Sequence, residues 1–303
     1  METTVSTSIA GLLRQVELDE ALETVAKAGF HLVDFPLSVF SRPKDSPLRQ
    51  PDWRQWVWNT KEKLARMGLS VSQTHASWEQ DIKENFSFEP PYEIFHRTVE
   101  ACRMLGCGKL VFHAPLYFFR MPTEKLREQV VQWCIRWFQE LLPVLERFDV
   151  TAELENTFDY RNIQQPGDPP FPFTSAADML ALRNGIGSRR VQLCLDTGHA
   201  NIYAQNVPNM IRAYGEHLEV LHLNDNFGLI SPLYSDLHLF PTYGRLDWEE
   251  IFNALYEIGY QGVFNLEPVG ELPRLSPAIR VMQLENARKI TEKLAVGAGF
   301  PIK

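Results

Sequence analysis

The chain has 303 residues, of which 45% are hydrophobic and 22% charged, and its formal net charge is -8. This length fits one barrel of alternating strands and helices as well as it fits two ordinary domains. The negative charge and the lack of a Lys/Arg-rich run argue against a nucleic-acid partner, and no apolar run is long enough to predict a membrane span.

The first eight residues are acidic and polar, whereas a signal peptide is basic and then apolar. A cytoplasmic location is therefore the default expectation. The four cysteines lack CxxC spacing, so we expect buried free thiols rather than a zinc finger or a disulfide framework. These cysteines are Cys102, Cys107, Cys134 and Cys194.

Short β-branched or apolar runs alternate along the chain with longer segments of helical periodicity. The predicted strands are 5–9, 31–36, 70–75, 109–113, 150–155, 191–196, 219–224 and 262–267. The predicted helices are 18–28, 53–67, 92–105, 124–148, 175–183, 248–258 and 278–294. Alternation of this kind predicts a parallel sheet, and eight strands predict an α/β fold, a (β/α)8 TIM barrel that spans 1–303 as a single domain. A Pro- and Gly-rich segment at 164–173 is either a lid over the strand ends or a passive surface loop.

Polar and apolar side chains alternate within the last four predicted strands. Glu153 and Glu155 flank Leu154, and Asp196 follows Leu195 in the same way. Because residues that face the surrounding helices must be apolar, the polar set is expected to point into the barrel. Several buried carboxylates without partners would cost several kcal/mol each, so a positive group is expected among them.

Four chemically distinctive residues stand at the carboxyl ends of predicted strands, the face where barrel enzymes carry out their chemistry. They are Glu155, Asp196, His222 and Glu267. Three carboxylates and one imidazole make an oxygen-rich ligand set, which suits Mn2+, Mg2+ or Co2+. We expect these residues to bind a divalent cation. The alternative is that each carboxylate is an ion-paired core residue.

Three more histidines are expected around the same mouth. His75 and His113 close the third and fourth strands, and His199 lies three residues after Asp196. Each could bind metal, but substrate contact is the preferred role. Trp78 follows the third strand, where its ring could pack on a sugar or serve ordinary packing.

In order and spacing, five segments resemble the xylose-isomerase-like TIM barrels, a family that includes sugar isomerases, ketose epimerases, inosose dehydratases and endonuclease IV. The segments are 153–156 (ELEN), 194–201 (CLDTGHAN), 222–226 (HLNDN), 236–248 (DLHLFPTYGRLDW) and 265–268 (NLEP). The resemblance covers nearly the whole chain. In the 236–248 segment, Thr242, Tyr243 and Gly244 replace the first glycine of the sugar isomerases. Arg161 stands where free-ketose epimerases tend to carry a second glutamate.

The resemblance implies one metal, Mn2+ first and Mg2+, Co2+ or Zn2+ as alternatives, bound by Glu155, Asp196, His222 and Glu267. It implies that Glu155 and Glu267 move a proton at a carbon next to a carbonyl through a metal-stabilised enediolate, as in an isomerase or epimerase of sugars. The expected substrate contacts are His75, His113, His199, Asp236, His238, Trp78 and Arg161. The partner is then a small sugar or polyol-derived molecule, and relatives that form dimers or tetramers imply a homo-oligomer.

Three alternatives stay open at this point. The same enediolate could expel a substituent, which would make the protein a lyase or dehydratase, including one that cleaves carbon-glycosides. Counterparts of all nine endonuclease IV ligands are present, so a three-zinc phosphodiesterase is the second alternative. A sugar-binding barrel without turnover is the third.

Overall fold

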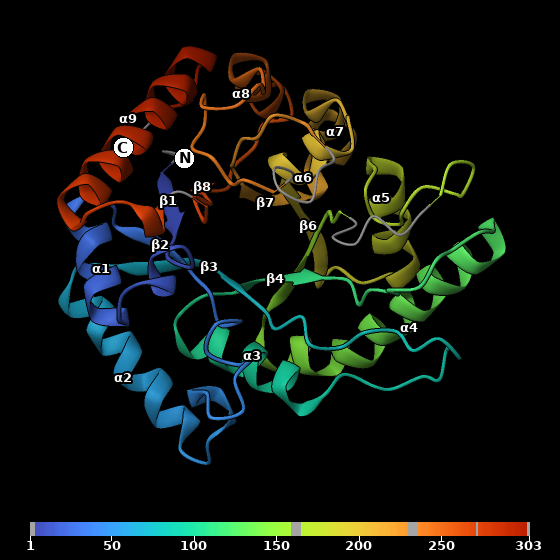
Figure 1. The fold of residues 1–303 in the computed structure, drawn as a ribbon. Helices are drawn as coiled ribbons and strands as arrows, with labels where there is room; N and C mark the ends of the chain where they lie inside the picture. Colours follow the sequence, from blue (N-terminus) through green and yellow to red (C-terminus); the bar gives the residue numbers. More distant parts are fainter. Residues whose placement is uncertain (1–3, 159–164, 230–235, 271, 302–303) are drawn as a thin grey trace.

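A computed structural model describes residues 4–158, 165–229, 236–270 and 272–301. Eight parallel strands form a nearly closed barrel with helices between them (Figure 1), as the sequence predicts. Each strand from β1 to β6 pairs with the next strand in the chain, and β8 pairs with β1. The strands are β1 (Val5–Ser8), β2 (Leu32–Phe35), β3 (Ser70–His75), β4 (Lys109–His113), β5 (Thr151–Glu155), β6 (Val191–Asp196), β7 (Leu218–His222) and β8 (Phe264–Leu266).

The barrel closes between β7 and β8, just beyond the end of β7. Leu223 and Leu266 form a parallel bridge there. The Leu223 amide donates to the Asn265 carbonyl at 2.8 Å, and the Glu267 amide donates to the Leu223 carbonyl at 3.0 Å. These two bonds hold the residues after β7 and β8 side by side, which places His222 next to Glu267.

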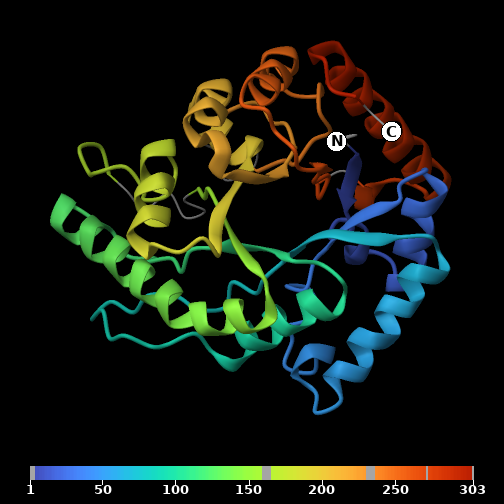
Figure 2. The ribbon, with the colours of Figure 1, turned by 180° about the vertical axis from the view of Figure 1, so that it is seen from behind.

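The helices form an outer ring around the barrel, seen from behind in Figure 2. Apolar residues of the strands, among them Leu154, Leu193 and Leu221, are fully buried in the core between strands and helices. The helices are α1 (Leu18–Lys27), α2 (Trp53–Arg66), α3 (Glu93–Met104), α4 (Glu124–Phe148), α5 (Ala176–Ile186), α6 (Thr197–Ile202), α7 (Val207–Tyr214), α8 (Trp248–Glu257) and α9 (Pro277–Ala298).

Two helices were not predicted from the sequence. Helix α6 has only six residues and contains Gly198, so its sequence gives little helical patterning. Helix α7 has eight residues, and its buried residues Val207, Met210, Ile211 and Tyr214 do follow the spacing of one helix face, although the segment is short. The start of α7 does carry a signal, since the Asn206 side chain accepts a hydrogen bond from the Asn209 amide and Pro208 stands in the first turn.

A chain of hydrogen bonds crosses the interior of the barrel. Ser6 Oγ donates to Asn265 Oδ1 at 2.7 Å, and the Asn265 amide donates to Asp34 Oδ2 at 3.3 Å. Gln73 Nε2 donates to the same Asp34 oxygen at 3.5 Å. All four side chains are buried. The polar residues therefore face inward, as the alternation predicts, and they form a floor beneath the strand ends.

Glu153 is a fully buried carboxylate on β5, and neither of its oxygens accepts a hydrogen bond from the described residues. Burial raises its pKa well above the usual value, Lys109 lowers it less, and Glu219 raises it further. Lys109 Nζ instead lies 3.1 Å from Glu219 Oε2. The neutral acid of Glu153 is therefore favoured, because burial of the carboxylate without a hydrogen-bond donor is costly.

A Glu153→Gln substitution should stabilise the protein at neutral pH. A carboxyl with a raised native pKa binds more protons folded than unfolded, so it costs stability as the pH rises above the unfolded pKa of about 4.3. Glutamine mimics the neutral acid and removes that cost, which we expect to be about 1–3 kcal/mol. Thermal melts between pH 4 and 8 should show a gain in Tm that shrinks toward acid. A variant equally stable or less stable across this range would contradict the argument.

The four cysteines are free and buried, as expected. Across the described residues, no helix combines the length and the apolar character needed to cross a bilayer.

Candidate metal centre and active site

Four side chains converge at the carboxyl-terminal mouth of the barrel. Glu155, Asp196 and His222 end β5, β6 and β7, and Glu267 directly follows β8. One ligand atom from each lies within 4.8 Å of the others. His222 Nδ1 is 3.0 Å from Glu155 Oε1 and 3.5 Å from Glu267 Oε2. All four are buried. The structure thus brings together the four residues that the sequence singled out.

The Asp196 carboxylate is held by two donors from different elements. Its Oδ1 caps α6 by accepting from the His199 amide at 2.7 Å, and its Oδ2 accepts from Asn224 Nδ2 at 2.7 Å. Gly198 leaves room for Asn224, because a Cβ at Gly198 would lie 1.9 Å from Asn224 Oδ1. A side chain at that position would therefore push away the amide that orients Asp196.

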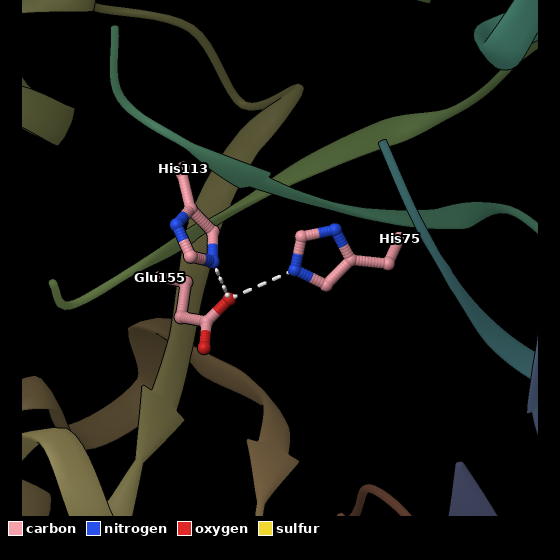
Figure 3. A group of neighbouring side chains, drawn as sticks. All are labelled: His75, His113 and Glu155. Atoms are coloured by element: carbon pink, nitrogen blue, oxygen red, sulfur yellow. Dashed lines mark hydrogen bonds and ion pairs between the residues drawn. The ribbon is translucent and has the colours of Figure 1, made fainter. Parts of the chain in front are cut away.

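Glu155 lies at the centre of the cluster (Figure 3). Its Oε2 is 3.2 Å from His75 Nε2 and 2.8 Å from His113 Nε2, and these histidines end β3 and β4. Its Oε1 lies against His222. One carboxylate oxygen of Glu155 therefore faces His75 and His113, and the other faces His222. His75, His113 and Glu155 form a second set of residues with metal-ligand spacing.

A third set with metal-ligand spacing lies at the same mouth and consists of His199, Asp236 and His238. His199 Nε2 is 3.7 Å from Asp236 Oδ1, and His238 Nε2 is 3.0 Å from the same oxygen. Asp236 and His238 belong to the segment between β7 and α8. A two-way backbone pairing between Asp225 and Leu239, with both bonds 2.9 Å long, fixes that segment against the barrel.

Three of these histidines have the Nδ1 atom tied to a backbone carbonyl. The Nδ1–H donates to the carbonyl, so Nε2, which faces the neighbouring carboxylates, is the ring atom that takes either a second proton or a metal ion. Metal-ligating histidines are usually oriented in this way. The pairs are His75 with the Ala76 oxygen at 2.9 Å, His199 with the Asn156 oxygen at 2.8 Å and His238 with the Glu267 oxygen at 3.1 Å.

The buried carboxylates of the cluster need positive charge nearby to stay ionised. Burial raises the pKa of Asp196 to about 7. Burial also disfavours the charged form of Glu267, but His222 and His238 lower the pKa of that carboxyl to about 2. Burial lowers the pKa of His222, and the charges of Glu267 and Glu155 outweigh it, so the pKa is raised well above the usual value. Protons on the imidazoles or a divalent cation can supply the charge that these carboxylates need.

The donor set fits a divalent cation. Three carboxylates and an imidazole are ligands that Mn2+, Mg2+, Co2+ and Zn2+ all accept. Glu267 Oε2 and His199 Nε2 are buried and make no hydrogen bond with the described residues, although charged partners lie nearby. Buried polar atoms of this kind usually have a ligand, an ion or an ordered water as partner.

The cluster opens into a cavity of about 310 Å³. Most of the predicted substrate contacts line it: His75, Trp78, His113, His199, Asp236 and His238. Arg14 and Arg42, which were not predicted as site residues, line the cavity too and add two cationic side chains.

The predicted substrate contact Arg161 lies outside the described residues, as does the whole of 159–164. In the described part of the predicted 164–173 loop, Asp168 forms an ion pair at 2.7 Å with Arg120, which lies in the segment between β4 and α4.

Asp34 was missed by the sequence reasoning. It is fully buried on β2, and its Oδ2 lies 3.7 Å from His222 Nε2, opposite the Nδ1 that faces the carboxylates. A lone aspartate within a strand has no spacing signal. Only the assembled barrel shows that it stands behind His222, where a carboxylate strengthens and orients a ligating imidazole.

We expect Asp34→Asn to weaken metal binding about 10- to 100-fold, because asparagine keeps the shape but loses the charge behind the imidazole. Competition titration against a chelator measures this. Asp19→Asn, an exposed position on α1, is the matched control. Equal affinities in Asp34→Asn and the wild type would mean that Asp34 only supports the fold.

A family model described as the xylose isomerase-like TIM barrel matches residues 22–288. The chain is 31% identical over 134 residues to D-psicose 3-epimerase of Enterocloster bolteae, a match that covers 44% of this chain and 38% of that protein. It is 27% identical over 176 residues to inosose isomerase of Bacillus velezensis, covering 57% and 58% respectively. Both matches span less than two thirds of the relative.

One solved structure with the same fold is that of the IOLI protein, which is described with a binding zinc atom. The TM-score is 0.71 at 17% sequence identity, and the alignment covers 99% of this chain and 100% of that one. The likeness extends over the whole barrel. The chain therefore belongs to the xylose isomerase-like TIM barrel family.

Proposed function

We propose that this protein is a divalent-metal-dependent isomerase or epimerase that acts on a small sugar or polyol-derived substrate. The observation that carries the proposal is the buried convergence of Glu155, Asp196, His222 and Glu267, with ligand atoms within 4.8 Å of one another, at the mouth of the barrel. The names of the curated relatives, an epimerase and an isomerase, support the same reaction class.

A bound cation, with Mn2+ as the first candidate, would act as a Lewis acid on a substrate carbonyl and the neighbouring hydroxyl and so acidify the intervening C–H. Glu155 and Glu267 both lie close to His222 Nδ1, at 3.0 Å and 3.5 Å. One carboxylate can therefore remove the proton from carbon while the other returns a proton. Return to the opposite face gives epimerisation, and return to the adjacent carbon gives isomerisation.

The other residues of the cavity would hold the substrate. His199 lies 3.6 Å from Glu155 through Nδ1, and the Nε2 of the same ring is free to contact a hydroxyl. The Trp78 side chain is 41% exposed, so an apolar ring face is available at the rim. Arg42 and Arg14 can donate hydrogen bonds to hydroxyl or carbonyl oxygens there.

Solvent-deuterium exchange tests the proposal. The metal-loaded protein is incubated in D2O with ketoses, inososes and keto-glycosides, and NMR follows incorporation at the carbon next to the carbonyl. We expect exchange with at least one compound, together with an epimer or isomer as product. A product that has lost a substituent would identify a lyase or dehydratase instead. Binding without exchange across the panel would indicate a sugar-binding barrel and overturn the proposal.

A second candidate, a three-metal phosphodiesterase, is favoured by one observation. The described residues hold three sets with metal-ligand spacing, and the two outer sets are His75, His113 and Glu155, and His199, Asp236 and His238. Elemental analysis distinguishes the two functions, because this candidate requires about three zinc ions per chain together with cleavage of abasic-site DNA. One ion per chain and intact DNA would dismiss it.

A further inference from the structure

A second cavity, of about 350 Å³, lies beside the mouth of the barrel. It shares Arg42, Trp78 and His113 with the cavity of the metal centre, so the two cavities are neighbours. The mechanism described above uses no residue that lines the second cavity alone.

The walls of this cavity are mostly apolar and aromatic. They come from the segments that follow β3 and β4 and from helices α3 and α4, and Arg42 is added by the segment after β2. The two segments leave the barrel side by side (Figure 1), and the Ile82 amide donates to the Leu116 carbonyl at 2.9 Å. The apolar lining residues are Phe95, Ala114, Pro115, Leu116, Phe118 and Trp137.

Two buried hydrogen-bond donors in the lining lack a partner in the described part of the chain. They are Ser77 Oγ and Trp137 Nε1, on side chains that are 1% and 0% exposed. An unpaired buried donor is costly. The other polar lining residues are Arg42, Gln80, Asp81 and His113. The cavity thus combines mostly apolar walls with a few polar side chains.

Trp78 stands between the two cavities. Its ring lies 5.3 Å from that of His75 and 5.5 Å from that of His113, and the Arg42 guanidinium lies 4.8 Å from its centroid. The side chain therefore contacts the residues around the metal centre and lines the apolar cavity at the same time.

We propose that the substrate is a sugar that carries an aromatic group, and that this second cavity binds the aromatic group while the sugar part occupies the metal centre. This inference rests on the proposed function. A free ketose would leave the apolar cavity unfilled. The volume is sufficient, since a cavity of about 150 Å³ already holds benzene. Aromatic walls favour a ring that packs face to face or edge to face with them, and the linking oxygen can accept a hydrogen bond from Arg42, which lines both cavities.

The test compares two keto-glycosides that share one sugar and differ only in a phenyl or a methyl group. With the metal-loaded protein, we expect kcat/KM for deuterium exchange to be about 10- to 100-fold higher for the phenyl compound, mostly through KM, because the ring is removed from water. Leu116→Trp fills the cavity and should abolish the difference without affecting the methyl compound. Leu116→Met, which conserves volume, should retain it.

Met282→Trp on the exposed face of α9 is the control for adding an indole. If Leu116→Trp does not fold by circular dichroism, Ala114→Leu takes its place. Equal kcat/KM values for the two glycosides, or a preference for the phenyl compound that survives filling of the cavity, would overturn the proposal.

If neither glycoside undergoes exchange, the proposed reaction fails, and binding decides the cavity separately. Saturation-transfer NMR on the phenyl glycoside should then show its ring protons as the most saturated, with the signal lost in the cavity-filling variant. Absence of saturation in the wild type would refute the cavity proposal as well.

Discussion

Glu155→Gln and Glu267→Gln should each reduce deuterium exchange and product formation by at least about 10³-fold, because each removes a group placed to transfer a proton and also a charged cation ligand. The fold should survive, since glutamine has nearly the same shape as glutamate. Glu155→Gln is expected to be the more damaging, because Oε1 and Oε2 of Glu155 contact two different sets of histidines. Steady-state kinetics with the best compound of the panel gives the size of the loss.

A matched control is Glu249→Gln, an exposed glutamate in the first turn of α8. It should keep full activity. Circular dichroism and melting temperature must show that the two site variants are folded before their loss of turnover is interpreted. Retention of more than about a tenth of the activity in both folded variants would rule out proton transfer by this pair of carboxylates.

Removal of divalent metal by a chelator should abolish turnover, and Mn2+ should restore it. Metal should also stabilise the fold, by about 2.7 kcal/mol at a concentration 100 times its Kd. Because Glu267 and Glu155 raise the pKa of His222, a proton competes with the cation for that imidazole. The concentration of metal needed for half-saturation should therefore rise as the pH falls. Calorimetry with several metals at pH 6 and pH 8 measures both effects.

Activity that persists after exhaustive chelation, with less than about 0.1 metal ion per chain by elemental analysis, would eliminate metal-dependent chemistry. Replacement of Asp196 by Asn gives an independent comparison. It should weaken binding of the cation, because asparagine loses the charge and keeps only one of the two oxygens that accept from the His199 amide and from Asn224 Nδ2.

The strand ends could be predicted from the sequence because a strand has a strict two-residue period. Glu155, Asp196 and His222 alternate with leucines, so their inward direction follows once the helix-facing side is recognised. The fold class depends on the same signal and is confirmed by the family match. Boundaries were less accurate: β7 ends at His222 and β8 at Leu266, before the predicted 224 and 267.

Other residues could not be found from sequence because their roles depend on distant contacts. The role of Asp34 is visible only in the folded barrel, where β2 and β7 bring its carboxylate within 3.7 Å of His222 Nε2. Asp225 was seen only as part of a motif, yet its carboxylate accepts from Arg245 N at 3.1 Å and Trp248 Nε1 at 2.8 Å and so anchors the segment that carries Asp236 and His238. The second cavity is likewise invisible in sequence, since its lining comes from five separate segments.

The hydrogen-bonded floor inside the barrel limits how this centre can be transferred to another scaffold. Most small barrels fill their middle with branched aliphatic side chains. Grafting only the four ligands onto such a barrel would remove the carboxylate of Asp34 from behind His222 and the amide of Asn265 that supports it. An engineer who wants this chemistry elsewhere must carry over Ser6, Asp34, Gln73 and Asn265 with the ligands, as one inseparable unit.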